Sequence, residues 1–114
     1  MSTTIYHNNR CRKSRETLQL LEEKQENIKI INYLETVPTV QELTEIISLL
    51  GIAPIQLIRK GEAIWKDNFK GKELSDAQLI EAMVTYPKLI ERPIVVKNGK
   101  AAIGRPPENV LNIL

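Results

Sequence analysis

The only cysteine of the chain, Cys11, lies in a short segment that is rich in cations. Its neighbours include Arg10, Arg12, Lys13 and Arg15. Nearby positive charge favours the ionised form of a thiol, and so do the amide groups at the start of a helix, which have no acceptor within the helix. We therefore expect the pKa of Cys11 to fall from the free value of about 8.5 toward neutrality, which would make this residue a thiolate nucleophile.

Each residue of this segment also has an ordinary structural interpretation. A lone cysteine often serves as a small buried hydrophobic side chain. Arg10 and Lys13 are equally consistent with a solvated surface. His7 precedes the cysteine on the same loop, within reach of the sulfur, and the alternative for it is a hydrogen bond to the backbone at the end of a strand. The geometry around Cys11 decides between these interpretations.

A thiolate beside free amide groups also forms an oxyanion pocket, because the same donors can hold phosphate or arsenate oxygens. Three further arginines occur at expected element boundaries, namely Arg59, Arg92 and Arg105. The planar guanidinium fork suits tetrahedral oxyanions. Any one of these arginines alone would be an ordinary surface residue, but their occurrence together with Cys11 predicts an oxyanion site.

The first part of the chain must place Cys11 between a strand and a helix. Residues 4–6 are typical of a short strand, and leucine spacing from Ser14 toward Lys24 predicts a helix. Residues 28–34 are rich in β-branched side chains and predict a second strand. This strand should run parallel to the first because a helix separates them.

The middle of the chain is expected to be helical. Capping boxes begin helices at Thr39 and Ser75, Gly51 ends the first of them, and residues 54–59 form a shorter turn or helix. We interpret residues 62–71 as a mobile loop near the site, with its Trp65 better suited to core packing.

The last part of the chain predicts a hairpin and a short helix. Asn98-Gly99 joins two strands, 93–97 and 100–103, because both turn positions need a positive φ. A helix over 108–114 then follows, with Val110, Leu111 and Leu114 facing inward. The complete order of elements predicts an α/β thioredoxin/glutaredoxin-like fold: a four-stranded mixed sheet with a helical insertion, at about residues 38–90, before the C-terminal hairpin.

Composition sets limits on the function. The 114 residues, 42% hydrophobic and 26% charged, fit a single domain over residues 1–114. A net charge of +2 is too small for nucleic-acid binding by bulk charge. One cysteine and one histidine cannot form an internal disulfide or supply a zinc site, so we expect no metal and no bound cofactor. Without a signal peptide or an apolar run of about 20 residues, we expect a cytoplasmic monomer with no membrane contact.

The spacing of these residues resembles that of one known family, the glutaredoxin-dependent arsenate reductases (ArsC). The resemblance follows His7-Asn8-x-x-Cys11-x-x-Ser14-Arg15, Leu57-Ile58-Arg59, Arg92-Pro93-Ile94-Val95 and Gly104-Arg105-Pro106. It implies a thioredoxin-like fold, a cis peptide before Pro93, and glutathione as co-substrate, followed by glutaredoxin. It also implies a role for each site residue. Cys11 is the nucleophile, His7 helps to keep it ionised, Arg59, Arg92 and Arg105 bind the oxyanion, and Asn8, Ser14 and Arg15 support the loop.

The chain departs from the family at two positions of the loop. The family commonly has proline after the His-Asn pair and a small residue after the cysteine, whereas this chain has Asn9 and Arg12. These changes favour a less constrained loop and a more positively charged entrance to the site at Cys11. The related family typified by Spx carries a second cysteine where this chain has Ser14, so no local disulfide can form here.

These observations together predict an arsenate reductase. Cys11 would attack arsenic while the three arginines neutralise the oxyanion and water leaves. Since the chain has no second cysteine, the electrons must come from an external thiol. The alternatives are a glutathione-dependent thiol reductase of the same fold and a non-catalytic, Spx-like interaction module. The complete arginine set favours the oxyanion enzyme over both.

Overall fold

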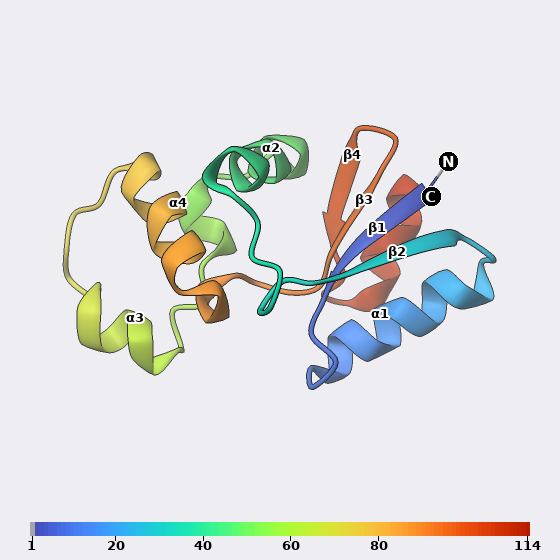
Figure 1. Cartoon of the computed structure of the whole chain (residues 1–114), viewed down its shortest axis with the longest axis horizontal. Helices are drawn as coiled ribbons and strands as arrows, with labels where there is room; N and C mark the ends of the chain where they lie inside the picture. The colour runs from blue at the N-terminus through green and yellow to red at the C-terminus, as the bar shows by residue number, and fades with distance from the viewer. Residues whose placement is uncertain (1) are drawn as a thin grey trace. The chain divides into compact units, whose positions relative to one another are not determined.

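The computed structural model describes residues 2–114 (Figure 1). The chain divides into two compact units, which are described separately. The sheet unit comprises the residues up to 36 together with 92–114, and the helical unit comprises residues 37–91. The expected single domain over residues 1–114 stays a prediction. None of the described helices is long and apolar enough to span a membrane.

The sheet unit contains a four-stranded mixed sheet, as the sequence predicted. Its strands are β1 (Ser2–His7), β2 (Asn27–Asn32), β3 (Ile94–Lys97) and β4 (Lys100–Ile103), in the spatial order β2-β1-β3-β4. β1 and β2 are parallel, whereas β3 runs antiparallel to both β1 and β4. The helix α1 (Arg12–Glu23) connects β1 to β2. Cys11 therefore lies at the junction of the first strand and the first helix.

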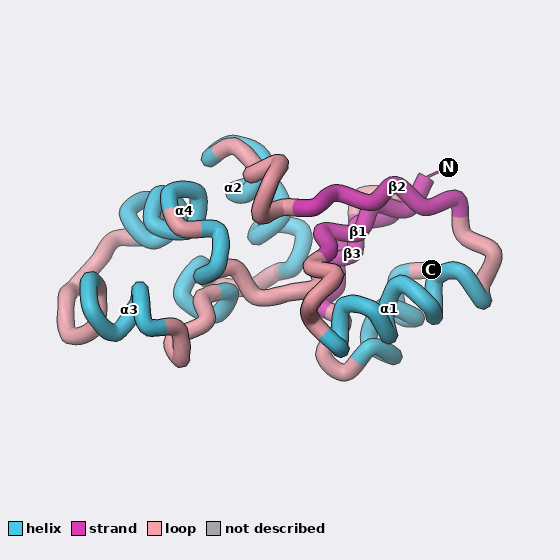
Figure 2. Tube along the Cα trace, turned by 60° about the horizontal axis from the view of Figure 1, so that its bottom comes forward, coloured by secondary structure: helices cyan, strands magenta, loops and turns pink. Residues whose placement is uncertain are grey.

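Two helices cover one face of this sheet. α1 and the 3₁₀-helix η3 (Pro107–Ile113) contact each other side by side (Figures 1 and 2). Ile5 of β1, Leu21 of α1, Val95 of β3 and Val110 of η3 form one cluster, each with 0% exposure. Burying each such side chain contributes roughly 1.5–3 kcal/mol. This cluster fixes β1 and α1, and with them the segment that carries Cys11.

The prediction that Leu111 and Leu114 face inward was wrong. Their exposed fractions are 40% and 36%. The terminal segment is a 3₁₀-helix with three residues per turn, so positions three apart share a face. Pro107 and Val110 occupy the buried face.

The helical unit begins each of its two main helices with a capping box, as predicted. α2 (Val40–Leu50) begins after Thr39, whose hydroxyl accepts a hydrogen bond from the Glu42 amide at 3.1 Å. α4 (Asp76–Thr85) begins in the same way after Ser75. Gly51 ends α2 with a φ of +68°, a backbone conformation that glycine adopts without strain. The short helices η1 (Pro54–Leu57), α3 (Ala63–Asn68) and η2 (Pro87–Leu89) complete the unit.

The prediction of a loop over residues 62–71 was wrong, because α3 occupies most of it. Trp65 of α3 is only 8% exposed and stacks on Phe69, with 5.6 Å between the ring centroids. Phe69 in turn meets Tyr86 edge-on at 6.0 Å. These aromatic contacts hold the segment in place, and they agree with the interpretation of Trp65 as a packing residue.

Candidate active site

Cys11 is the residue that precedes the first turn of α1, and it is 7% exposed. Its amide donates to the Asn8 carbonyl at 3.0 Å, and its carbonyl accepts the first hydrogen bond of the helix from the Arg15 amide, also at 3.0 Å. The amides of residues 12–14 have no acceptor within the helix, so their partial positive charge lies beside Cys11. Its side chain accepts no capping hydrogen bond from these amides.

The sulfur of Cys11 contacts an arginine from the other end of the chain. Arg105 Nη1 donates to Cys11 Sγ at 3.7 Å and to the Arg92 carbonyl at 3.2 Å. The Nε and Nη1 atoms of Arg92 are shielded from solvent. The peptide bonds after Arg92 and Arg105 are both cis, which confirms the cis peptide expected before Pro93. The sheet unit therefore brings Arg105 to the sulfur of Cys11 and the backbone of Arg92 to Arg105.

His7 has a side-chain partner that the sequence did not suggest. Its Nδ1 lies 2.6 Å from Ser14 Oγ, which also accepts a hydrogen bond from the Asn8 amide at 3.0 Å. Burial lowers the pKa of His7 below its usual value of 6.5, and the positive charge of Arg15 lowers it further. This lowered pKa favours the neutral imidazole. The role of His7 in keeping Cys11 ionised stays a prediction.

The remaining supporting residues shape the loop between β1 and α1. Arg15 Nη1 donates to the Asn9 carbonyl at 3.1 Å. The Asn8 side chain accepts from the Arg10 amide at 3.0 Å, which closes a local turn. Asn8 and Arg15 thus hold the backbone that presents Cys11.

Arg59 lies in the helical unit, where two carboxylates hold its side chain. Its Nη1 lies 2.9 Å from Glu62 and its Nε 3.8 Å from Glu91. An antiparallel bridge between Ile58 and Ile90 fixes the backbone next to it. Arg59 and Glu62 are three residues apart, and this spacing in the sequence is typical of an ion pair. Nothing in the sequence pointed to Glu91. The roles of Arg59, Arg92 and Arg105 in oxyanion binding stay predictions.

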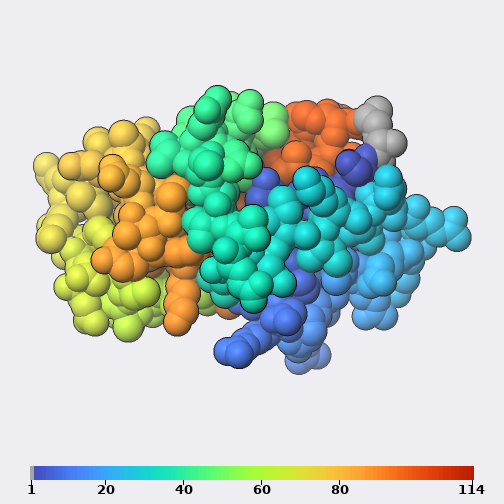
Figure 3. Space-filling model, viewed as in Figure 1, coloured from blue at the N-terminus to red at the C-terminus, as the bar shows by residue number. Residues whose placement is uncertain are grey.

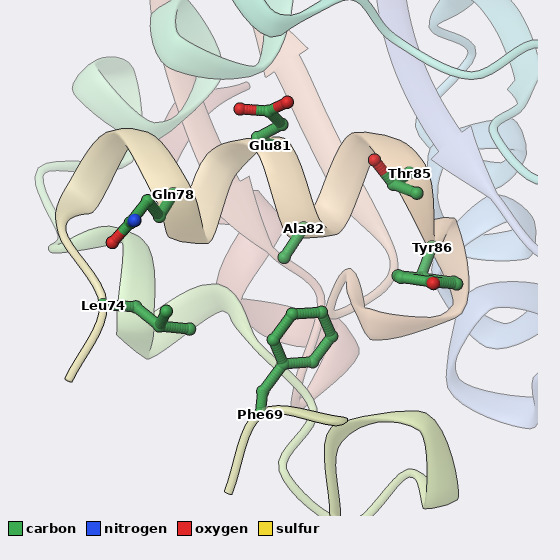
Figure 4. Close-up of a pocket in the computed structure, with 7 residues that line it drawn as sticks. All are labelled: Phe69, Leu74, Gln78, Glu81, Ala82, Thr85 and Tyr86. Atoms are coloured by element: carbon green, nitrogen blue, oxygen red, sulfur yellow. The ribbon is translucent and has the colours of Figure 1, made fainter. Parts of the chain in front are cut away.

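The helical unit also contains an open pocket of about 280 Å³ beside α4 (Figure 4). Its lining residues are Phe69, Leu74, Gln78, Glu81, Ala82, Thr85 and Tyr86. They include no thiol and no cation, so this pocket offers neither the nucleophile nor the positive charge that oxyanion chemistry needs. Within residues 2–114, no group of three or more His, Cys, Asp or Glu side chains could hold a metal ion.

Gly104, which precedes Arg105, packs closely against α1. We therefore expect Gly104→Ala to destabilise the protein. Its amide donates to the Pro93 carbonyl at 2.9 Å, and an added methyl group would collide with Thr17 of α1 and the Pro93 ring. Overpacking of this kind costs about 1–3 kcal/mol. Urea denaturation should show this loss, together with a fall in activity as Arg105 moves.

Gly61→Ala is a matched control, because an added Cβ at that position meets no atom within 4 Å. We expect it to change the free energy of unfolding by less than about 0.5 kcal/mol. Equal unfolding midpoints for the two variants would contradict the close packing inferred at Gly104.

A β-α-β unit followed by an antiparallel hairpin and a helix, with a cysteine at the start of the first helix, defines a thioredoxin-like protein. The model of the ArsC family matches residues 6–113. The chain belongs to the ArsC family.

Individual relatives agree with this assignment. A solved structure, the arsenate reductase from Vibrio cholerae, superimposes with a TM-score of 0.95 at 51% identity, covering 100% of this chain and 98% of that one. The arsenate reductase of Haemophilus influenzae is 47% identical over 116 residues, with full coverage of both chains. YfgD of Escherichia coli strain K12, an uncharacterized protein, is 50% identical over 112 residues, or 96% of this chain and 94% of its own.

Proposed function

We propose that this protein is an arsenate reductase that reduces arsenate to arsenite at Cys11. The observation that carries the proposal is the contact between Arg105 Nη1 and Cys11 Sγ at 3.7 Å, with the same nitrogen anchored on the Arg92 carbonyl. A cation held beside a thiol suits both the thiolate and the oxyanion that it attacks. The names of the Vibrio and Haemophilus relatives support this substrate.

In the first step, the Cys11 thiolate attacks the arsenic atom of bound arsenate. A sulfur–arsenic bond forms, one arsenic–oxygen bond breaks, and the oxygen leaves as water after protonation. The guanidinium groups of Arg92 and Arg105, with the amides at the start of α1, neutralise the remaining oxygens. The family resemblance assigns the role of third cation to Arg59, whose side chain pairs with Glu62 and Glu91 in this structure.

In the second step, an external thiol supplies the electrons, because Cys11 is the only cysteine. The incoming thiolate attacks the Cys11 sulfur, a disulfide forms, and the sulfur–arsenic bond breaks with its electron pair on arsenic, which leaves as arsenite. A second thiol then reduces the mixed disulfide. One arsenate and two thiols thus give one arsenite, one disulfide and water. We assign these roles to glutathione and glutaredoxin, in the reducing cytoplasm.

A coupled assay tests this function. With glutathione, glutaredoxin, glutathione reductase and NADPH present, we expect NADPH oxidation that depends on both this protein and arsenate. Phosphate or sulfate in place of arsenate should give no oxidation, since neither accepts electrons from a thiol. No arsenate-dependent turnover, with reduction of a glutathione mixed disulfide by this protein when glutaredoxin is left out, would favour a thiol reductase. No activity on either substrate would favour an interaction module.

A further inference from the structure

The cations around Cys11 fall into two groups with different surroundings. Arg105 contacts the sulfur, and Arg92 has side-chain atoms shielded from solvent. By contrast, Arg10 and Arg12, which flank Cys11 in the chain, are exposed. Together with Lys13 we call these flanking residues the cationic rim. They lie where the β1–α1 loop passes into the first turn of α1, a segment coloured blue at the lower edge of Figure 3.

The rim holds more positive charge than its own carboxylates neutralise. Arg12 lies 3.7 Å from Glu16, with 85% of its side chain exposed, and Lys13 shares that same carboxylate at 4.0 Å. The described ion pairs include no carboxylate on Arg10. Arg12 and Lys13 therefore share one acidic partner, and the three rim cations have only that carboxylate among their described ion pairs, in a chain whose net charge is only +2.

The rim residues are the chain neighbours of the sulfur that the reductant must reach. Cys11 is 7% exposed, so only the sulfur end of a thiol can reach it while the rest of the molecule stays outside. Arsenate is too small to reach the rim while Cys11 attacks it, because all of its oxygens are bonded to the arsenic atom that is attacked. In the proposed function Arg92 and Arg105 serve the oxyanion, which leaves the exposed rim cations for the body of the incoming thiol.

We propose that Arg10 and Arg12 form a docking site for the carboxylates of an anionic thiol, the class to which glutathione belongs. Exposed guanidinium groups attract carboxylates over several ångströms and pair with them in a planar fork. The proposal deepens the proposed function by giving the reductant a recognition site. It rests on the proposed function only in taking the anionic thiol as the reductant of that reaction.

Thiol–disulfide exchange without arsenate tests this docking site directly. The Cys11 thiolate attacks a small disulfide, a mixed disulfide forms on the protein, and one thiolate leaves. The probes are glutathione disulfide, which is anionic, hydroxyethyl disulfide, which is neutral, and cystamine, which is cationic. Mass spectrometry measures the rate of mixed-disulfide formation, and each rate is divided by the rate for a free, neutral cysteine derivative.

We expect the native protein to prefer the anionic disulfide over the cationic one. The double variant Arg10→Ala/Arg12→Ala should reduce that preference by roughly three- to tenfold, as expected for exposed ion pairs. Raising the salt from about 0.01 M to about 1 M should have a similar effect, because the screening length falls from roughly 30 Å to roughly 3 Å. The charge-reversed variant Arg10→Glu/Arg12→Glu should prefer cystamine.

The charge-matched control is Lys24→Ala/Lys29→Ala, which removes two exposed cations beyond the last turn of α1 and on β2. It should keep the native preference. An unchanged preference in the rim variant, an equal change in the control, or no mixed disulfide with any probe would overturn the proposal. A missing arsenate-dependent turnover in the coupled assay would instead overturn the proposed function, because the exchange assay contains no arsenate.

Discussion

Cys11→Ser is expected to abolish arsenate-dependent turnover, reducing it to the uncatalysed background. Serine keeps the size and position of the side chain, but its hydroxyl is not ionised at neutral pH and cannot form the disulfide that releases arsenite. No other thiol in the chain can replace it. Initial rates in the coupled assay, at saturating glutathione and glutaredoxin, measure the effect.

Ser14→Ala provides the matched comparison for this variant. Ser14 lies one helical turn from Cys11. Its hydroxyl forms a hydrogen bond with His7 and accepts another from the Asn8 amide. Losing the Ser14 hydroxyl leaves buried partners without a hydrogen bond, at a cost of roughly 1–3 kcal/mol each in stability, while the nucleophile remains. We therefore expect much of the activity to persist. Complete loss in both variants, with both still folded by circular dichroism, would show that Ser14 takes part in the chemistry.

The second large effect is expected from the arginines. Arg105→Ala and Arg92→Ala should each weaken arsenate turnover on the order of ten- to hundredfold, because a charge-assisted hydrogen bond contributes roughly 1.5–3 kcal/mol. Arg59→Ala should act in the same direction. Arginine-to-lysine changes should recover only part of the loss, because lysine keeps the charge but not the planar fork.

The same variants should affect a second reaction much less. A glutathione mixed disulfide presents no tetrahedral oxyanion, so its reduction should depend weakly on these three arginines. Both activities are measured at one salt concentration, with thermal unfolding as a control for folding. Equal losses for arsenate and for the mixed disulfide, or no loss for either, would contradict an oxyanion clamp.

Most of the fold could be predicted because its signals are local. The capping boxes at Thr39 and Ser75 begin helices through contacts between residues three apart. Asn98 and Gly99 both adopt the positive φ that the hairpin turn requires. The parallel pairing of β1 and β2 followed from the helix between them. Such features depend on a few neighbouring residues, which a sequence displays directly.

The features that could not be predicted depend on contacts between distant residues. α3 is short, and its order comes from Trp65 packing on Phe69 and from Phe69 meeting Tyr86, which is 17 residues further on. Likewise, the pairing of Arg59 with Glu91 arises only when two segments form a bridge. The His7–Ser14 hydrogen bond depends on the angle between β1 and α1. Residue types indicated the candidate site, but its hydrogen bonds had to come from the structure.

The contact between Cys11 and Arg105 joins residues that are 94 positions apart. During synthesis on a ribosome, the thiol emerges early, and all of residues 37–91 must follow before its arginine appears. The cysteine is therefore without this cation until residue 105 has emerged and the hairpin has paired with β1. The site is therefore complete only after β3 has paired with β1. Until then, the growing chain carries a thiol that lacks the arginine needed to bind an oxyanion.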